Sequence, residues 1–402
     1  MADEVPRRAM WAGLRSQLVK LTSQFFTSVD DHLRFRAVCK SWRSAVPHRP
    51  DHLPTQLPFL LLVSTTEPKM GPAYRLIAAS AGNVRSLPNT ANMLCIGSSF
   101  GWLILLSEND CLINLFNPVT AEDIRLPRLD GPTFADVVPP GDEVVIVVEK
   151  AVLSSDPTLD RDFVAVVFML GVNIRWLTWR HGDESWTANA NPDVQLSSGM
   201  RDVVPYGNRI LCAIYGDNDD WAVLQVDPGP PARATIAAWY AMPSCVPRTK
   251  GLTYLVVSAG ELLLAAPHDN DNRTANVNIT PGYRVFRLEP GGISRPAVAV
   301  EVFTLTEDIH DRILFLSPSS SVSVSAEDFF GFPGNFIYFV GKDWREKREN
   351  RRVWLVVVQS LESGETTVVA DSNISDQRPL RWRGRRSDAA RWVTPNLRSY
   401  NR

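Results

Sequence analysis

The segment FGWLILLSENDCLINLFNPVTAEDIRLP, residues 100–127, decides the fold. It contains two short apolar runs, GWLILLS (101–107) and LINLFNP (112–118), with polar residues between them. Short runs of this kind, bounded by Gly, Asn, Asp and Pro, are typical of β-strands. Gly101 suits a tight turn into the first strand, and Asn117-Pro118 ends the second strand and begins another turn. The segment therefore predicts consecutive short strands, with the indole of Trp102 packed between sheets.

The same pattern extends from this segment through most of the chain. Roughly twenty short runs rich in Val, Ile, Leu, Phe and Trp alternate with turns. Helical periods are nearly absent after residue 50, so we expect a closed or radial all-β architecture. The runs group into units near the ~40–50 residues of a propeller blade. These units span residues 58–88, 94–127, 144–189, 203–240, 252–305 and 312–370. We predict a β-propeller of about six blades; five or seven blades, or a pair of two-sheet sandwiches, are the alternatives.

Residues 10–46 carry a helical pattern instead. A stripe of apolar residues at steps of three and four predicts a first helix; it consists of Trp11, Leu14, Leu18, Leu21 and Phe25. Two short amphipathic helices cannot bury both of their apolar stripes against each other. We therefore expect some apolar surface to remain for a partner.

Ser28 and Asp31 form an imperfect capping box, which predicts the start of a second helix. Pro47 and Pro50 end this helix. The apolar residues of one face are Phe35, Val38, Cys39, Trp42 and Val46. A cysteine on such a face is expected to act as a small buried hydrophobe, with redox reactivity as the alternative.

These patterns divide the chain into five parts. They are an N-terminal tail (1–9), a helical domain (10–50), a linker (51–57), a β domain (58–397) and a C-terminal tail (398–402).

The composition excludes several classes of protein. The formal net charge of −2 gives the chain no long-range attraction to nucleic acid or to an anionic membrane. No run approaches eighteen apolar residues, so we expect no membrane span. The cysteine number is odd, no two are in CxxC spacing, and the first ten residues contain no apolar signal core. These features favour a reducing compartment, the cytosol or the nucleus.

Motifs that could carry catalysis or bind a metal lack their required context. Residues 97–101 fit G-x-S-x-G, but a strand follows directly where a hydrolase needs a helix, so we expect a turn. His48 and His52 stand four apart, yet neighbouring prolines forbid the helix that would align them on a metal. We therefore expect no enzymatic activity, no metal site and no cofactor.

The C-terminal segment 378–402 contains eight arginines, together with Trp382 and Trp392. Arginine with tryptophan can bind nucleic acid through phosphate contacts and stacking. The alternative is a closing segment with both tryptophans anchored and the arginine heads exposed. No nucleic-acid-binding fold accompanies the segment, so we favour the second interpretation.

Residues 11–46, WAGLRSQLVKLTSQFFTSVDDHLRFRAVCKSWRSAV, resemble the F-box motif, especially its plant version, and VCKSWR (38–43) is the most specific part. The family usually has Leu-Pro near the start, whereas Arg15 follows Leu14 here. In this family the helices bind a Skp-type adaptor, which links to a cullin ubiquitin ligase. The resemblance implies an adaptor-binding surface made of Leu14, Leu18, Leu21, Leu33, Val38, Cys39 and Trp42.

The β domain resembles the KIB-type β-propeller that follows the F-box in a large plant family. Residues 100–127 match its GWL…LxNPxTxxxIxLP element. Residues 312–344 match its LFLG…SxSxSAxxFPGxxxNxIYF element, with Ser317 for glycine and Phe336 for cysteine. Residues 392–397 match its closing W-x-x-P-S-L element, with Asn396 for serine.

Together these resemblances imply the substrate-recognition subunit of a Skp–cullin–F-box ubiquitin ligase, in which the propeller binds a target protein that the sequence does not identify. A ligase-independent interaction module with a degenerate F-box is the first alternative. A propeller enzyme or lectin is the second, and it would need carboxylates or histidines around the central channel.

Overall fold

The structure is a computed structural model. It describes residues 13–47, 52–54, 56–64, 73–78, 84–88, 90, 92–107, 109–129, 148–169, 175–190, 200–215, 220–241, 253–267, 282–288, 300–302, 304–306, 308–329, 331–342, 352–374 and 391–395.

The described part of the N-terminal region folds into three helices, α2 (Ser16–Ser23), α3 (Val29–Ala37) and α4 (Lys40–Ala45). Ser28 is the N-cap of α3, and its Oγ accepts from the Asp30 N–H at 3.2 Å, which confirms the predicted helix start. The expectation of one continuous second helix is wrong, because the helical conformation is interrupted between the end of α3 and the start of α4. Cys39 there has extended backbone (φ −160°), and its Sγ accepts from the Trp42 N–H at 3.5 Å.

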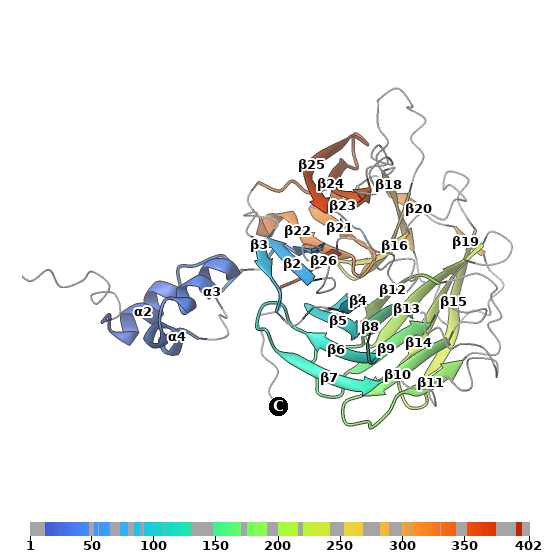
Figure 1. Ribbon diagram of the computed structural model, residues 1–402. Coiled ribbons are helices and arrows are strands. Elements are labelled where there is room, and N and C mark those ends of the chain that lie inside the picture. The colour runs from blue at the N-terminus through green and yellow to red at the C-terminus, as the bar shows by residue number, and fades with distance from the viewer. Residues whose placement is uncertain are drawn as a thin grey trace, which may run out of the picture.

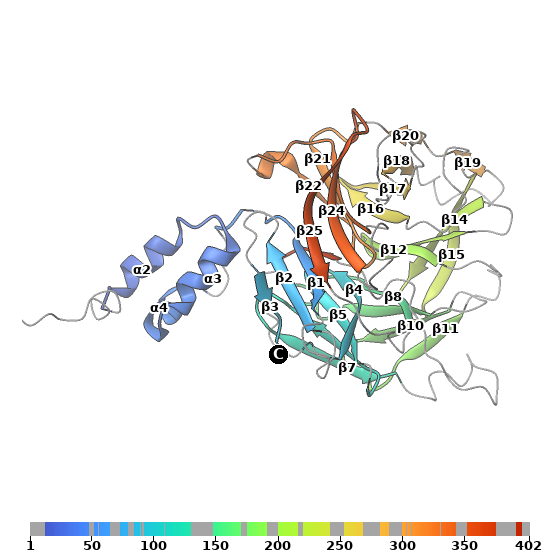
Figure 2. The same ribbon diagram turned by 45° about the horizontal axis from the view of Figure 1, so that its top comes forward.

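The described strands of the β domain form six sheets arranged around a central axis (Figures 1 and 2), which confirms the predicted propeller and its blade count. We number them blades 1 to 6 and give their strands from the axis outward. Blade 1 is β26 (Arg391–Val393), β1 (Phe59–Ser64), β2 (Ala73–Ala78) and β3 (Val84–Ser86); blade 2 is β4 (Met93–Ser99), β5 (Trp102–Ser107), β6 (Leu112–Phe116) and β7 (Asp123–Arg128); blade 3 is β8 (Val148–Leu153), β9 (Val164–Met169), β10 (Arg175–Arg180) and β11 (Thr187–Ala190).

Blades 4 and 6 depart from four strands. Blade 4 is β12 (Met200–Tyr206), β13 (Arg209–Tyr215), β14 (Asp220–Asp227), β15 (Arg233–Ala241) and β19 (Val300–Val302); blade 5 is β16 (Tyr254–Ser258), β17 (Glu261–Pro267), β18 (Tyr283–Leu288) and β20 (Thr304–Thr306); blade 6 is β22 (Val322–Ser325), β21 (Arg312–Leu316), β23 (Phe336–Lys342), β24 (Arg352–Ser360) and β25 (Thr366–Ile374), with a short 3-10 helix η1 (Ala326–Asp328). Thus β19, from the predicted fifth unit, pairs in parallel with β15 of blade 4.

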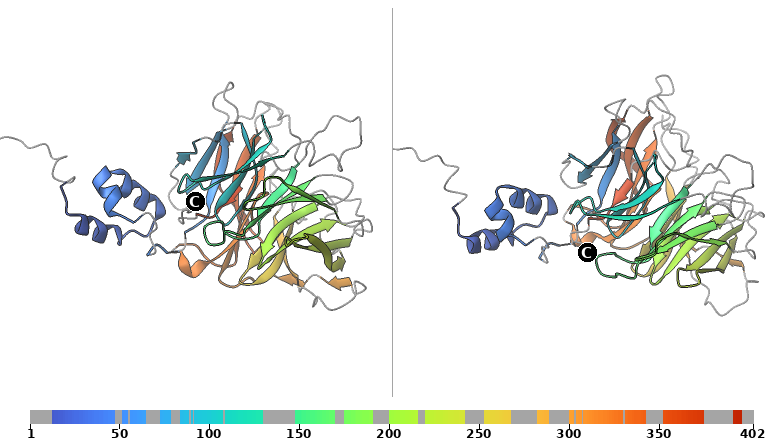
Figure 3. Two further views of the ribbon diagram at one scale, coloured as in Figure 1. Left: turned by 90° about the horizontal axis from the view of Figure 1, so that it is seen from below. Right: turned by 60° about the horizontal axis from the view of Figure 1, so that its bottom comes forward.

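Apolar side chains fill the spaces between neighbouring blades. Six buried clusters join blades 1 and 2, 2 and 3, 3 and 4, 4 and 5, 5 and 6, and 6 and 1. Trp102 is fully buried in the cluster between blades 2 and 3, as predicted. The clusters therefore close the blades into a ring. Figure 3 shows the same sheets from two further directions, with the three helices to one side.

The two ends of the propeller sequence meet in blade 1, because β26 pairs antiparallel with β1. Trp392 is buried, and its ring lies 5.0 Å from that of Phe315 in blade 6. Its anchoring fits the predicted closing segment; Trp382 lies outside the described residues. The expectation of exposed arginine heads is wrong for Arg391, which is buried beside Tyr74 and Cys95. Burial raises the pKa of Tyr74 to about 12, and Arg391 partly offsets this effect.

The first three residues of the G-x-S-x-G segment end strand β4, and its last two form the turn into β5. Phe100 (φ +52°) and Gly101 (φ +81°) join β4 to β5, and the conformation at both positions is typical of tight hairpins. Ser99 Oγ accepts from the Leu153 N–H of blade 3 at 3.2 Å. A Cβ on Gly97 would lie 1.9 Å from the Ala151 carbonyl oxygen, so only glycine fits there. These residues hold blades 2 and 3 together.

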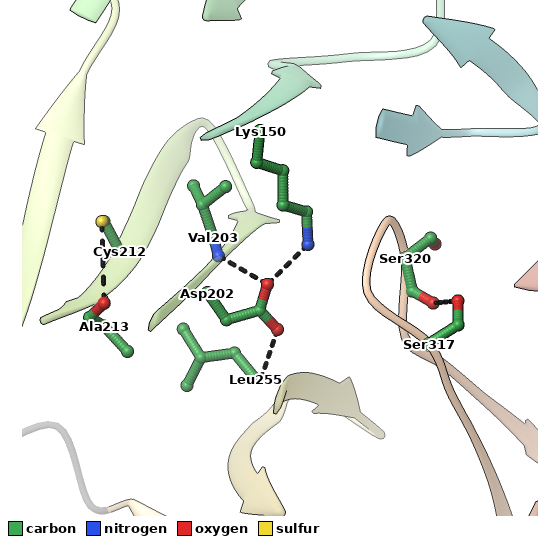
Figure 4. A network of polar contacts seen from close by, with 8 residues as sticks. All are labelled: Lys150, Asp202, Val203, Cys212, Ala213, Leu255, Ser317 and Ser320. Atoms are coloured by element: carbon green, nitrogen blue, oxygen red, sulfur yellow. Dashed lines mark hydrogen bonds and ion pairs between the residues drawn. The ribbon is translucent and has the colours of Figure 1, made fainter. Parts of the chain in front are cut away.

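A buried ion pair links the innermost strands of three blades (Figure 4). Lys150 Nζ of β8 lies 2.6 Å from Asp202 Oδ1 of β12. The same carboxylate accepts from the Val203 N–H at 2.9 Å and from the Leu255 N–H of β16 at 2.7 Å. Both charged groups are therefore engaged within the framework of blades 3, 4 and 5.

Candidate docking surface of the helical head

Helices α2, α3 and α4, which we call the helical head, lie to one side of the propeller (Figures 1 and 2). A small apolar core holds them together. Val19, Trp42 and Val46 are buried, and partly buried side chains pack against them, namely Leu14, Phe35, Cys39 and Ala45. The rings of Phe35 and Trp42 lie 4.3 Å apart. The head therefore has its own core, and Trp42 lies in that core.

A second set of apolar side chains in the head is left uncovered. Leu18 and Leu21 on α2 are 50% and 54% exposed, and Phe25, just beyond its end, is 79% exposed. Their spacing places them on one face of the helical turn. We call Leu18, Leu21 and Phe25 the exposed apolar stripe. Val38, between α3 and α4, is 56% exposed as well.

The seven residues expected to bind an adaptor thus fall into three environments. Leu18, Leu21 and Val38 are exposed, whereas Trp42 is buried and Leu14 and Cys39 are partly buried in the core of the head. Leu33 packs instead against the apolar cluster of blades 1 and 2. None of these placements tests adaptor binding, which stays a prediction.

The head is attached to the propeller through α3 and the linker. Val29 belongs to the cluster between blades 1 and 2, and Leu53 of the linker packs against it beside Leu33. Gln56 accepts from the Val29 N–H at 3.0 Å and donates to the Thr27 carbonyl at 2.9 Å. These contacts fix the direction in which the helical head points from the propeller.

The basic residues of the head lie mainly in solvent. Arg34, Lys40 and Arg43 are exposed. Arg36 is partly buried and donates to the Val46 carbonyl; burial, and then the nearby Arg43, lower its pKa. Three of these four charged side chains are therefore solvated rather than part of the core of the head.

Phe25 is the functional candidate that the seven-residue prediction left out. It continues the spacing of Leu18 and Leu21 and is the most exposed of the large apolar side chains in the described residues. The same period of three and four that predicted α2 was the signal that could have found it.

The described residues show no cluster that could bind a metal: no three His, Cys, Asp or Glu side chains come together suitably. His48 lies outside the described residues, and the ring of His52 lies 6.2 Å from that of His32. No helix in the described part of the chain is long and apolar enough to cross a membrane.

Comparison with known proteins supplies the family. The KIB1-4 beta-propeller family model matches residues 76–366. F-box protein SKIP23 of Arabidopsis thaliana is 27% identical over 368 residues, which cover 82% of this chain and 84% of that protein. F-box protein At2g05970 of the same plant is 28% identical over 134 residues, 31% of this chain and 34% of that protein.

Among solved structures, the Myceliophteria thermophila Cps50 (Swd1) beta-propeller domain matches with a TM-score of 0.38 and 10% identity, over 76% of this chain and 81% of that one. The names of the two plant relatives agree with the F-box resemblance of residues 11–46. Because the family model spans well over half of the sequence, the chain belongs to the KIB1-4 beta-propeller family.

Proposed function

We propose that this protein is the substrate-recognition subunit of a Skp–cullin–F-box ubiquitin ligase. The observation that carries the proposal is the exposed apolar stripe, three large side chains on a head that is already folded around its own core. Such a patch on a soluble protein marks an interaction site. Its position in an F-box-like segment makes a Skp-type adaptor the partner.

In this proposal the exposed residues contact the adaptor and the buried ones act indirectly. Leu18, Leu21, Phe25 and Val38 form the contact. Leu14, Cys39 and Trp42 hold the helices in position from within the core, and Leu33 joins the head to the propeller. Burying each large apolar side chain contributes about 1.5–3 kcal/mol.

The propeller would bind the target protein and carry out no bond chemistry. Lys150 and Asp202 near the axis are engaged with each other and with backbone groups, which supports a structural role for them. The contribution of the subunit is proximity: it brings target lysines close to the charged ubiquitin carrier. The attachment of the head through Leu33 and Gln56 would set the orientation in which the target is presented.

Adaptor binding by the full chain tests this proposal. We expect a plant Skp-type adaptor to bind the purified protein, and L18D/L21D to weaken binding by up to about 1,000-fold, because anchor residues contribute about 2 kcal/mol, or about 30-fold, each. Leu159→Asp is the matched control, since Leu159 is 67% exposed on the propeller. Failure of the wild-type protein to bind would refute the function. Binding by L18D/L21D as tight as that of the wild-type protein would refute the assignment of the exposed apolar stripe as the adaptor-binding surface.

The ligase-independent interaction module remains the second candidate, and the departure at Arg15 is what favours it. A complex that contains the adaptor but excludes the cullin would support it. Purification of the reconstituted complex by size-exclusion chromatography distinguishes the two candidates, because the ligase subunit must bring the cullin with it.

We also propose that the protein works in the cytosol or nucleus. Four described cysteines are free thiols, as expected in a reducing compartment: Cys39, Cys95, Cys111 and Cys212. Imaging of a fluorescent fusion tests this placement, and secretion would contradict it.

A further inference from the structure

The basic residues of this chain are unevenly divided between lysine and arginine. Of 42 in total, seven are lysine and 35 are arginine. Lysine is ordinarily among the commonest residues of soluble proteins. The seven are Lys20, Lys40, Lys69, Lys150, Lys250, Lys342 and Lys347. Because the two residue types carry the same charge, net charge alone does not account for the division.

Burial is described for three of the lysines, Lys20, Lys40 and Lys150, and none of the three is exposed on the propeller. Lys20 and Lys40 are exposed, but they belong to the head, where Lys20 precedes Leu21 and Lys40 lies two residues after Val38 of the proposed adaptor contact. Lys150 is almost fully buried, with its Nζ 2.6 Å from Asp202. Lys69, Lys250 and Lys347 lie outside the described residues, and Lys342 is the last residue of β23.

The exposed cations in the described part of the propeller are all arginine. They come from blades 2, 3 and 4 and are Arg125, Arg128, Arg161, Arg209 and Arg233. The side chain of Arg125 is 82% exposed. The surface thus keeps positive charge while its described part offers no lysine amine.

This difference matters for ubiquitin transfer. A neutral lysine amine attacks the thioester carbonyl of the ubiquitin carrier; the C–S bond breaks, the carrier cysteine leaves as a thiolate, and the nitrogen loses a proton. An arginine guanidinium stays protonated, because its pKa lies far above physiological pH, and so has no comparable nucleophilic amine. Arginine therefore retains charge without accepting ubiquitin.

We propose that the lysine-poor propeller surface protects this subunit from ubiquitination by its own ligase. The inference rests on the proposed function, because the protection has a use only beside a charged ubiquitin carrier. Ubiquitin would then pass to lysines of the bound target, and the receptor would remain available for further rounds.

The test uses the full chain assembled with adaptor, cullin and RING subunits, the activating enzyme, a ubiquitin carrier and ubiquitin. The variant R125K/R161K/R209K/R233K adds four amines at unchanged charge. Substitution of the same four positions by Gln is the control, because it adds no amine. We expect the lysine variant to carry several-fold more ubiquitin per chain than wild type, with new conjugates found at the introduced lysines by mass spectrometry. The glutamine variant should match wild type.

The proposal is overturned if wild type is already modified as heavily as the lysine variant, or if the introduced lysines stay unmodified. Thermal melting and adaptor affinity, measured on all three proteins, confirm that each is folded and assembled. A wild-type chain that binds no adaptor would instead refute the proposed function, so the two failures are distinguishable.

Discussion

Cys39 occupies the N-terminal cap of α4, a position that Ser, Thr, Asp or Asn usually fill. Its Sγ lies 3.4 Å from Ser41 Oγ and accepts from the Trp42 N–H at 3.5 Å. The Ser41 hydroxyl first, and then the Trp42 N–H, lower the pKa of this thiol. At the residue scale, a side chain expected to act as an apolar filler therefore also holds the start of a helix.

Cys39 is predicted to react with iodoacetamide at lower pH than an ordinary cysteine, because its lowered pKa gives more thiolate near neutral pH. Cys95 should react slowly, since burial raises its pKa. The favoured thiolate also means that the head gains stability as pH rises through the folded-state pKa of Cys39. Mass spectrometry of labelled peptides across a pH series measures how fast each of the two thiols reacts. Cys39→Ser, which keeps a capping atom, is the control; equal labelling of Cys39 and Cys95 would contradict the prediction.

Arg15 stands where the F-box pattern has proline, yet its backbone has the conformation that proline would impose. Its φ is −59° and its ψ is 136° at the N-cap of α2. Proline fixes φ near −65°. Arg15→Pro is therefore expected to stabilise the head by about 0.4–1 kcal/mol through a less flexible unfolded chain. Thermal unfolding of the full protein and adaptor affinity check this. Loss of adaptor binding by the proline variant would show that the arginine itself is required.

The inner strands β8, β12 and β16 illustrate how elements are joined across blades. The carboxylate of Asp202 meets Lys150 from one neighbour and the Leu255 N–H from the other. Burying this pair costs solvation, and removing one partner costs more because it leaves a charge without compensation. The pair therefore specifies which blades are neighbours at least as much as it stabilises them.

Lys150→Met is predicted to lower the free energy of unfolding by about 3–5 kcal/mol, because the Asp202 carboxylate loses its cation. K150M/D202N should lose less than the sum of the single changes, since the neutral amide still accepts a backbone hydrogen bond. Arg125→Met, which removes an exposed cation, should change the free energy of unfolding by less than about 0.5 kcal/mol. Urea unfolding with tryptophan fluorescence measures five proteins: wild type, K150M, D202N, K150M/D202N and R125M. Unaltered stability of K150M would contradict the structural role of the pair.

Local sequence predicted the elements far better than their partners. The runs flanking residues 108–111 became β5 and β6 because turn residues bounded them on both sides. The joining of β26 to β1 and of β19 to β15 could not be read from periodicity, because pairing between distant segments leaves no local pattern. The interruption of the helix at Cys39 was not predicted for a related reason, since the helical spacing of apolar residues continues from α3 into α4 without a change at Cys39.

The environments of the candidate-site residues could be predicted only in part, for the same physical reason, and their role in adaptor binding stays a prediction. The helical period shows that Leu18, Leu21 and Trp42 lie on apolar stripes, but not which stripe becomes the core of the head. That choice depends on how three helices pack together. Leu33, expected at the adaptor-binding surface, packs against blades 1 and 2, and that contact could not be foreseen because only the folded propeller creates it.

At the scale of the whole molecule, the ring depends on a short closing strand. Arg391, Trp392 and Val393 of β26 pair with β1 and are all buried. The Trp392 N–H donates to Ser317 Oγ of blade 6 at 3.0 Å, and that hydroxyl donates to the Ser320 carbonyl at 2.7 Å (Figure 4 shows the second contact). Ser317, which replaces the glycine of the family pattern, thus ties the last blade to the first. A ring of this kind leaves only short, protected blade edges.

Removal of residues 391–402 is therefore predicted to open the propeller, whereas removal of 396–402 should leave it closed. The longer deletion takes away the innermost strand of blade 1 and uncovers apolar side chains of β1 and β21, which favours aggregation. We expect it to elute as aggregate in size-exclusion chromatography and to lose amide protection in β1, β2 and β21. The loss of amide protection in Ser317→Ala should lie between those of the two deletions. This variant leaves the buried backbone N–H of Trp392 without its acceptor, at a cost of about 1–3 kcal/mol. Hydrogen exchange on the three variants separates these outcomes. A chain lacking 391–402 that stays monomeric with wild-type protection would show that the blades close without β26, through the apolar contacts that remain between blades 6 and 1 after Trp392 is lost.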